Sequence, residues 1–289
     1  ATRRYVDEHF GPRPRSRFIS LLGDAEMDEG NVWEAIADPS TRGLGNVMWI
    51  VDFNRQSLDR VVPGVRIKEW RGMFEAAGWH VEELKYGSRA RKAFETEDGY
   101  LLRELIDNMA NEQYQSLFSL TGEDFRDQLI SKADERTRQF VGAMDLEVLL
   151  SVVFDLGGHD YTALLESFQR CDNQVDRPSV VFAYTVKGWG LPFAGSPRNH
   201  SALMTTEQME ELRTRSQLTI DDEWSRFDPS SAVGAALLER GSFLVGSDWK
   251  STHQGFETIP KETGVATSRI STQDAFGRVL VDISRNETL

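Results

Sequence analysis

The stretch Gly23-Asp24-Ala25-Glu26-Met27-Asp28-Glu29 and the later stretch Asp52-Phe53-Asn54-Arg55-Gln56 decide the fold class of this chain. Each follows a run of apolar residues, so Asp24 and Asn54 are predicted to lie where two buried strands end. In open α/β sheets, ligands bind outside the carboxyl ends of the strands. A carboxylate, an amide oxygen and the backbone carbonyl of Gln56 are the oxygen ligands that Mg²⁺ prefers. The pattern therefore predicts a magnesium site that carries a phosphorylated cofactor.

The rest of the chain alternates predicted strands and helices. Strands are expected at 18–22, 47–51, 79–84 and 179–184, and helices at 28–37, 67–77 and 161–170. The stretch 89–150, with N-cap candidates Thr121 and Asp145, is expected to form a helical insertion or layer. Strands joined through helices predict an α/β fold, with a doubly wound, mostly parallel sheet and helices on both faces.

Composition restricts the classes of function. The chain of 289 residues has 39% hydrophobic residues, enough for a substantial core, and a formal net charge of -13 that disfavours nucleic acid as a partner. Cys171 is the single cysteine, so no internal disulfide is possible and an oxidising compartment is not implied. No apolar stretch is long enough to span a membrane. We expect a soluble, cytoplasmic protein.

Further motifs are spread along the chain. They are Phe74-Glu75-Ala76-Ala77-Gly78-Trp79, Tyr114-Gln115, Gly157-Gly158-His159-Asp160, Thr185-Val186-Lys187-Gly188-Trp189-Gly190 and Ile270-Ser271-Thr272. With the two opening stretches, the second continuing through Ser57-Leu58-Asp59, they run in the order found in one family. The sequence resembles the homodimeric, decarboxylating first component of the pyruvate dehydrogenase complex, within the transketolase-like thiamine diphosphate enzymes.

The resemblance implies a domain organisation. Residues 1–215 would form a diphosphate-binding domain that lacks its first part, 216–268 a linker, and 269–289 the start of a truncated pyrimidine-binding domain. The chain opens without Met and closes just after an amphipathic segment, so we expect a fragment of a longer polypeptide.

The resemblance also implies roles for individual residues. The cofactor would contact Gly23, Asp24, Ala25, Glu26, Asn54 and Lys187; Asp24, Asn54 and the carbonyl of Gln56 would hold Mg²⁺; and His200 would be catalytic, orienting the substrate and assisting acyl transfer. Three features depart from the family pattern: Ala25 replaces a glycine, Asp52-Phe53 replaces a small polar pair, and Ser196-Pro197-Arg198 precede Asn199 and His200.

The function implied is oxidative decarboxylation of a 2-oxo acid, with pyruvate favoured, dependent on thiamine diphosphate and Mg²⁺. The acyl group would pass to a lipoyl-bearing acyltransferase component, and a second copy of the parent chain would complete a homodimer. Because the carboxylate that activates the aminopyrimidine belongs to the missing domain, this chain alone is expected to be inactive. A transketolase-like transferase and a non-catalytic paralogue remain as alternatives.

Several residues have simpler interpretations. Most of the acidic cluster Glu26, Asp28, Glu29 and Glu34 is expected to be solvated carboxylate at a helix start, with Glu26 retained as a residue supporting the site. His159 could act as an acid or base, but a glycine pair before a helix more often forms a turn. Cys171 has no apparent histidine partner, and no zinc motif is present.

Overall fold

The computed structural model of the chain describes residues 2–11, 16–57, 60–61, 67–244 and 270–284. Leu58 and Asp59 of the second motif, and residues 245–268 of the expected linker, lie outside the described residues. The chain divides into two compact units, residues 1–218 and residues 219–289.

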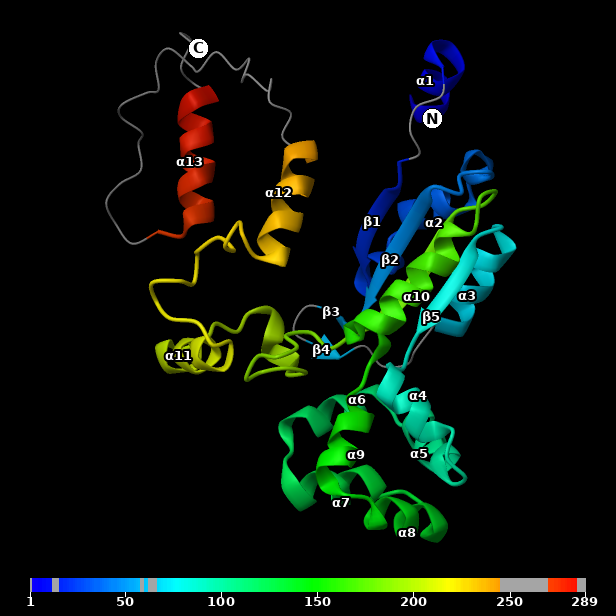
Figure 1. Ribbon diagram of the computed structural model, residues 1–289, viewed down its shortest axis with the longest axis vertical. Helices are drawn as coiled ribbons and strands as arrows, with labels where there is room; N and C mark the ends of the chain where they lie inside the picture. Colours follow the sequence, from blue (N-terminus) through cyan, green and yellow to red (C-terminus); the bar gives the residue numbers. More distant parts are fainter. Residues whose placement is uncertain (1, 12–15, 58–59, 62–66, 245–269, 285–289) are drawn as a thin grey trace. The chain divides into compact units, whose positions relative to one another are not determined.

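The first unit is built on a parallel sheet with strand order β1-β2-β6-β5 (Figure 1). Its strands are β1 (Phe18–Gly23), β2 (Val47–Phe53), β5 (His80–Leu84) and β6 (Ser179–Tyr184). β6 lies between β2 and β5, pairs in parallel with both, and is buried at every residue. The parallel α/β sheet predicted from the alternation of strands and helices is confirmed.

Helices cover both faces of this sheet at β2, β5 and β6, and the side chains of these strands alternate between two hydrophobic clusters. Val51 and Phe182 pack into the larger cluster, with residues of helices α2 and α3. Met48 and Val181 point the other way, into a smaller cluster with residues of α10. The covering helices are α2 (Gly30–Ala37), α3 (Ile67–Ala76) and α10 (Tyr161–Asp172). The sheet is therefore doubly wound, as expected.

The predicted helical insertion is also confirmed, between β5 and α10. It consists of α4 (Ser88–Phe94), α5 (Gly99–Asp107), α6 (Asn111–Ser116), α7 (Gly122–Ile130), α8 (Glu135–Ala143) and α9 (Leu146–Val153). The Asp145 side chain caps α9 by accepting hydrogen bonds from the backbone N–H groups of residues 147 and 148. Thr121 occupies the N-cap of α7 without a side-chain hydrogen bond.

The remaining elements of the described residues are short or lie outside the sheet. They are α1 (Thr2–Phe10), β3 (Gln56–Ser57), β4 (Arg60–Val61), α11 (Thr206–Arg215), α12 (Ala232–Leu244) and α13 (Thr272–Ser284), with 3-10 turns η1 (Asp24–Asp28), η2 (Pro39–Thr41), η3 (Leu117–Ser119), η4 (Gly157–His159) and η5 (Pro197–His200). Within the described ranges, every helix is too short or too polar to cross a bilayer.

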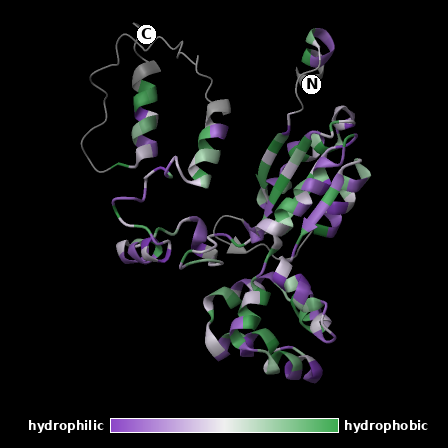
Figure 2. Cartoon of the chain, in the orientation of Figure 1, coloured by the Kyte–Doolittle hydropathy of each residue, from purple (hydrophilic) through white to green (hydrophobic). Residues whose placement is uncertain are grey.

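The expectation that residues 18–22 form a buried strand is wrong. The strand exists, but it lies at the edge of the sheet, and Phe18, Ile19 and Leu21 are 50%, 54% and 74% exposed. Figure 2 shows the hydrophobic character of this strand in green. An apolar run predicts that a strand forms, but it does not show whether neighbouring elements cover that strand.

Two element boundaries also differ from the sequence prediction. The helix expected at 28–37 divides into η1 and α2, because Glu29 has an extended backbone with φ -83° and ψ 127°. β5 begins at His80, since Trp79 closes the turn after α3 and its indole N–H donates to the backbone oxygen of Ile36 at 3.1 Å. Gly78 in that turn has φ +87°, the left-handed conformation expected of a residue that ends a helix.

The aromatic core beside α3 generates a test of this packing. Phe74 is fully buried, and its ring lies 5.3 Å from that of Trp79 and 5.7 Å from that of Phe182. We expect Phe74→Ala to lower the free energy of unfolding by about 3–5 kcal/mol, because the cavity left behind cannot close. Met73→Ala, at a 48% exposed neighbour on the same helix, is the control and should change it by no more than about 0.5 kcal/mol. Urea denaturation followed by circular dichroism measures both; equal effects would contradict this description of the core.

Candidate functional site

The parallel strands bring the two predicted motifs together at one edge of the sheet. β1 pairs with β2 so that Gly23 lies beside Asp52, and the residues that follow each strand end are therefore neighbours. The Asp24 carboxylate accepts a hydrogen bond from the backbone N–H of Arg55 at 2.5 Å, across 31 positions of sequence. Asp24, Asn54 and Gln56 are buried, with 6%, 8% and 3% of their surface exposed.

Asp24 is a buried carboxylate without a cationic side chain bonded to it among the described residues. The pKa of Asp24 is raised from its ordinary 3.8 to about 6, chiefly by burial and also by the nearby Asp52 carboxylate, while the hydrogen bond from the Arg55 amide opposes the shift. A divalent cation would remove much of this electrostatic cost. The environment of Asp24 thus fits a metal ligand better than it fits a simple helix cap.

Asn54 and Gln56 are held by their own hydrogen bonds. The Asn54 side-chain oxygen accepts the Gln56 backbone N–H at 3.0 Å, and its amide nitrogen donates to Asp52 at 3.1 Å. The Gln56 side chain donates to the backbone oxygen of Gly195 at 3.1 Å, while its own Oε1 is buried without a hydrogen-bond partner in the described part of the chain. An unpaired buried oxygen at this edge is a further polar group that a bound ligand could satisfy.

Gln115, on α6, completes this arrangement and was not among the predicted site residues. Its side chain donates to the backbone oxygen of Asn54 at 3.2 Å and accepts from the Gln56 amide at 3.2 Å. The Tyr114-Gln115 motif marked the position in the sequence, but no local pattern indicates that α6 reaches the strand ends. Gln115 therefore fixes the loop that carries Asn54 and Gln56.

The first motif forms η1, and three of its residues can be judged individually. Gly23 is extended, with φ -79° and ψ 154°, a backbone conformation that residues other than glycine also adopt. Ala25 is not among the described residues with positive φ, so its methyl group imposes no backbone strain. Glu26 is exposed and accepts the Gly23 N–H at 2.9 Å, which holds the turn that presents Asp24.

Lys187 and His200, predicted separately, lie together at the two ends of one loop. The Lys187 ammonium nitrogen is 3.1 Å from His200 Nδ1, so when lysine donates, the imidazole proton resides on Nε2. Asn199 ties the loop together by donating to the backbone oxygens of Lys187 and Phe193. Since Gly195 of this loop accepts from Gln56, the loop is connected to the buried site.

His159 has a structural role rather than a chemical one in this arrangement. Its Nε2 accepts the Val186 N–H at 2.9 Å, and its ring stacks on Trp189 with centroids 4.7 Å apart. Burial lowers the pKa of His159, which keeps that nitrogen available as an acceptor. Cys171 is buried, and burial raises the pKa of its thiol to about 11, which disfavours a nucleophilic thiolate at neutral pH.

A metal at this edge would depend on mixed oxygen ligands. Among the described residues, no three His, Cys, Asp or Glu side chains come together in a way that could hold a metal ion. The candidate ligands are instead one carboxylate, one amide oxygen and one backbone carbonyl, a set that suits Mg²⁺ with diphosphate oxygens and water completing the shell. The residues present therefore fit the magnesium and diphosphate predicted from the sequence.

Comparison with known families agrees with this geometry. A family model described as "Transketolase, thiamine diphosphate binding domain" matches residues 7–96, which include both strand-end motifs. The chain thus contains a region of the transketolase-type, thiamine diphosphate-binding class.

Among individual proteins, the chain is similar to the E1 components of pyruvate dehydrogenase. The pyruvate dehydrogenase E1 component of Corynebacterium glutamicum is 30% identical over 215 residues, which cover 73% of this chain and 23% of that protein. The E1 component of Escherichia coli K12 is 28% identical over 222 residues, 74% of this chain and 25% of that protein. The chain is related to pyruvate dehydrogenase E1 components, and the resemblance noted in the sequence is confirmed. The chain spans about a quarter of the length of these relatives.

The solved structures to which the chain is similar include transketolases. That of Leishmania mexicana has a TM-score of 0.45 and 14% identity, covering 79% of this chain and 24% of that one. That of Campylobacter jejuni has a TM-score of 0.40 and 16% identity, covering 94% of this chain and 33% of that one.

The unusual pKa of Asp24 predicts a pH-dependent stability in metal-free protein. The folded chain binds a proton at Asp24 between pH 6 and 3.8, where the unfolded chain does not, so the ionised carboxylate destabilises the fold above pH 6. Asp24→Asn should therefore raise the free energy of unfolding at pH 7 by up to about 3 kcal/mol.

The gain should shrink as the pH falls through 6 and vanish near 3.8. Urea denaturation in a chelating buffer at several pH values measures it. A gain from Asp24→Asn that does not change with pH would show that the carboxylate is not destabilised by burial.

Proposed function

We propose that this chain supplies the diphosphate- and magnesium-binding part of a thiamine diphosphate-dependent enzyme that decarboxylates a 2-oxo acid. The observation that carries the proposal is the buried Asp24 carboxylate, which has no cationic side chain bonded to it in the described structure and lies beside Asn54 and Gln56. The similarity to pyruvate dehydrogenase E1 components favours pyruvate as the substrate. Mg²⁺ would be held by Asp24, Asn54 and the Gln56 carbonyl.

The remaining residues would position the cofactor. Gly23 has open space where a side chain would be, which would let phosphate approach the backbone near Ala25 and Glu26. When bound, thiamine diphosphate supplies the electron sink for decarboxylation. Lys187 offers a positive charge at the loop, and its hydrogen bond to Nδ1 leaves His200 with a proton on Nε2 to donate to substrate.

The relatives' names also support the wider assignment. We propose that the enzyme passes its acyl group to the lipoyl group of an acyltransferase component, works as a homodimer, and needs parts beyond these residues for turnover. The proposed division remains a diphosphate-binding domain at 1–215, a linker at 216–268 and the beginning of a pyrimidine-binding domain at 269–289.

Calorimetric titration tests the cofactor site directly. Thiamine diphosphate is added to the full-length parent protein with and without Mg²⁺, and we expect binding that requires the metal. Asp24→Asn should weaken it at least about tenfold, because a charged metal ligand becomes neutral. Asp28→Asn is the matched control, since Asp28 belongs to the same acidic cluster but is exposed, and it should bind as the unaltered protein does.

The outcomes separate a cofactor-binding enzyme from a non-catalytic paralogue. Binding that Asp24→Asn loses and Asp28→Asn keeps would support the proposal. Equal weakening by both variants would indicate only a general loss of negative charge. No binding of thiamine diphosphate with Mg²⁺ by the unaltered protein would favour a non-catalytic paralogue.

A further inference from the structure

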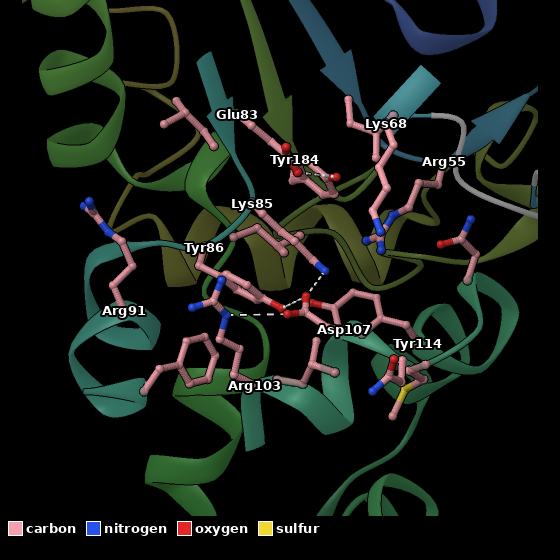
Figure 3. Close-up of a pocket in the computed structure, with 18 of the residues that line it drawn as sticks. Arg55, Lys68, Glu83, Lys85, Tyr86, Arg91, Arg103, Asp107, Tyr114 and Tyr184 are labelled. Carbon is pink, nitrogen blue, oxygen red and sulfur yellow. Dashed lines mark hydrogen bonds and ion pairs between the residues drawn. The ribbon is translucent and has the colours of Figure 1, made fainter. Parts of the chain in front are cut away.

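A cavity lies beside the Asn54–Gln56 loop, and Arg55 of that loop lines it. This cavity, of about 1000 Å³, opens between the ends of β5 and β6 and helices α3 to α6, all within the first unit (Figure 3). Asp24, Asn54 and Gln56 do not line it. Its walls carry seven Lys or Arg side chains and three carboxylates, so the cavity has an excess of positive charge.

Arg55 is the unusual member of this wall. The residue is only 8% exposed, and its guanidinium carbon lies 4.6 Å from the centroid of Tyr114 and 5.9 Å from that of Tyr184. Its Nε and Nη2 atoms are buried and have no hydrogen-bond partner among the described residues. Stacking on tyrosine stabilises the charge, but it leaves these donors unsatisfied, which is costly for a buried group.

The two unsatisfied donors point to one kind of ligand. Nε–H and Nη2–H lie along the same edge of a guanidinium, the edge that binds two oxygens of a phosphate or carboxylate at once. Figure 3 shows Arg55 extending into the cavity. The two buried donors of the positively charged guanidinium therefore favour an oxyanion over a neutral or cationic ligand.

The charges around Arg55 favour phosphate over a single carboxylate. Lys68, at the start of α3, lines the same cavity, and within the described chain it makes no hydrogen bond or ion pair. Farther along the wall, Lys85 and Arg103 share the single carboxylate of Asp107. Two unpaired cations match the charge of a phosphate group, close to -2 at neutral pH.

We propose that this cavity binds the phosphate group of a small metabolite, with the Arg55 guanidinium as the bidentate anchor and Lys68 as the second charge. The volume leaves room for the rest of such a molecule beside the phosphate. This site is separate from the one proposed for thiamine diphosphate, since Arg55 directs its amide to Asp24 and its side chain into the cavity.

Inorganic phosphate is the probe for the test. It is titrated into the protein by calorimetry in buffer free of Mg²⁺ and thiamine diphosphate, so the result does not depend on the cofactor site. We expect saturable binding that Arg55→Gln weakens roughly 10-fold to 100-fold, the effect of losing a charge-assisted, bidentate contact. Malonate, a dicarboxylate of similar charge, is titrated in parallel and should bind more weakly than phosphate.

Arg136→Gln provides the matched control. Its guanidinium also lies over a tyrosine ring, 5.6 Å from the centroid of Tyr100, but Arg136 is outside the cavity and paired with Asp98. This variant loses the same charge and should bind phosphate as the unaltered protein does.

Lys68→Gln keeps the test decisive if Arg55→Gln does not fold, because Lys68 is exposed and its replacement leaves the core intact. We expect this variant to bind phosphate several-fold more weakly, because the cavity loses one of the two positive charges that would contact the phosphate. Equal phosphate binding by the unaltered protein and the Arg55 and Lys68 variants would overturn the proposal. So would the absence of phosphate binding by the unaltered protein, or a preference for malonate.

Discussion

The parallel pairing of β6 with both β2 and β5 determines where the rest of the first unit lies. Because parallel strands share one direction, their carboxyl ends meet at one edge of the sheet. Each return to the other end requires a crossover, and the helices that make the crossovers cover the two faces with the core described above. The same constraint thus builds the hydrophobic core and gathers the polar residues after each strand.

Two opposite charges, those of Asp24 and Arg55, lie buried at this edge, and among the described residues their side chains do not form a direct ion pair with each other. The carboxylate of Asp24 meets the backbone amide of Arg55, whereas the guanidinium of Arg55 extends away over Tyr114. Each charge is stabilised by weaker partners, a hydrogen bond for one and an aromatic ring for the other. Buried charges in proteins are normally paired, and this is the reason why we propose a cation as the ligand of Asp24 and an oxyanion as the ligand of Arg55.

The sequence predicted those features that depend on neighbours along the chain. Asp24 and Asn54 follow apolar runs directly, so their position at strand ends could be inferred, and the parallel sheet followed from the order of elements. The exposure of Ile19 and Leu21 could not be inferred, because it depends on which helices cover the edge strand. Gln115 and the direction of the Arg55 side chain were also beyond local patterns, since both result from how α6 packs against the strand ends.

Arg55 has φ +63°, a left-handed backbone that only a few non-glycine residues adopt. This conformation directs the main chain toward one site and the side chain toward another. The backbone amide of Arg55 contacts Asp24, while the guanidinium of the same residue lines the cavity. A ligand at either site that shifts the backbone of Arg55 would alter the affinity of the other site, and the second ligand would alter the first by the same factor.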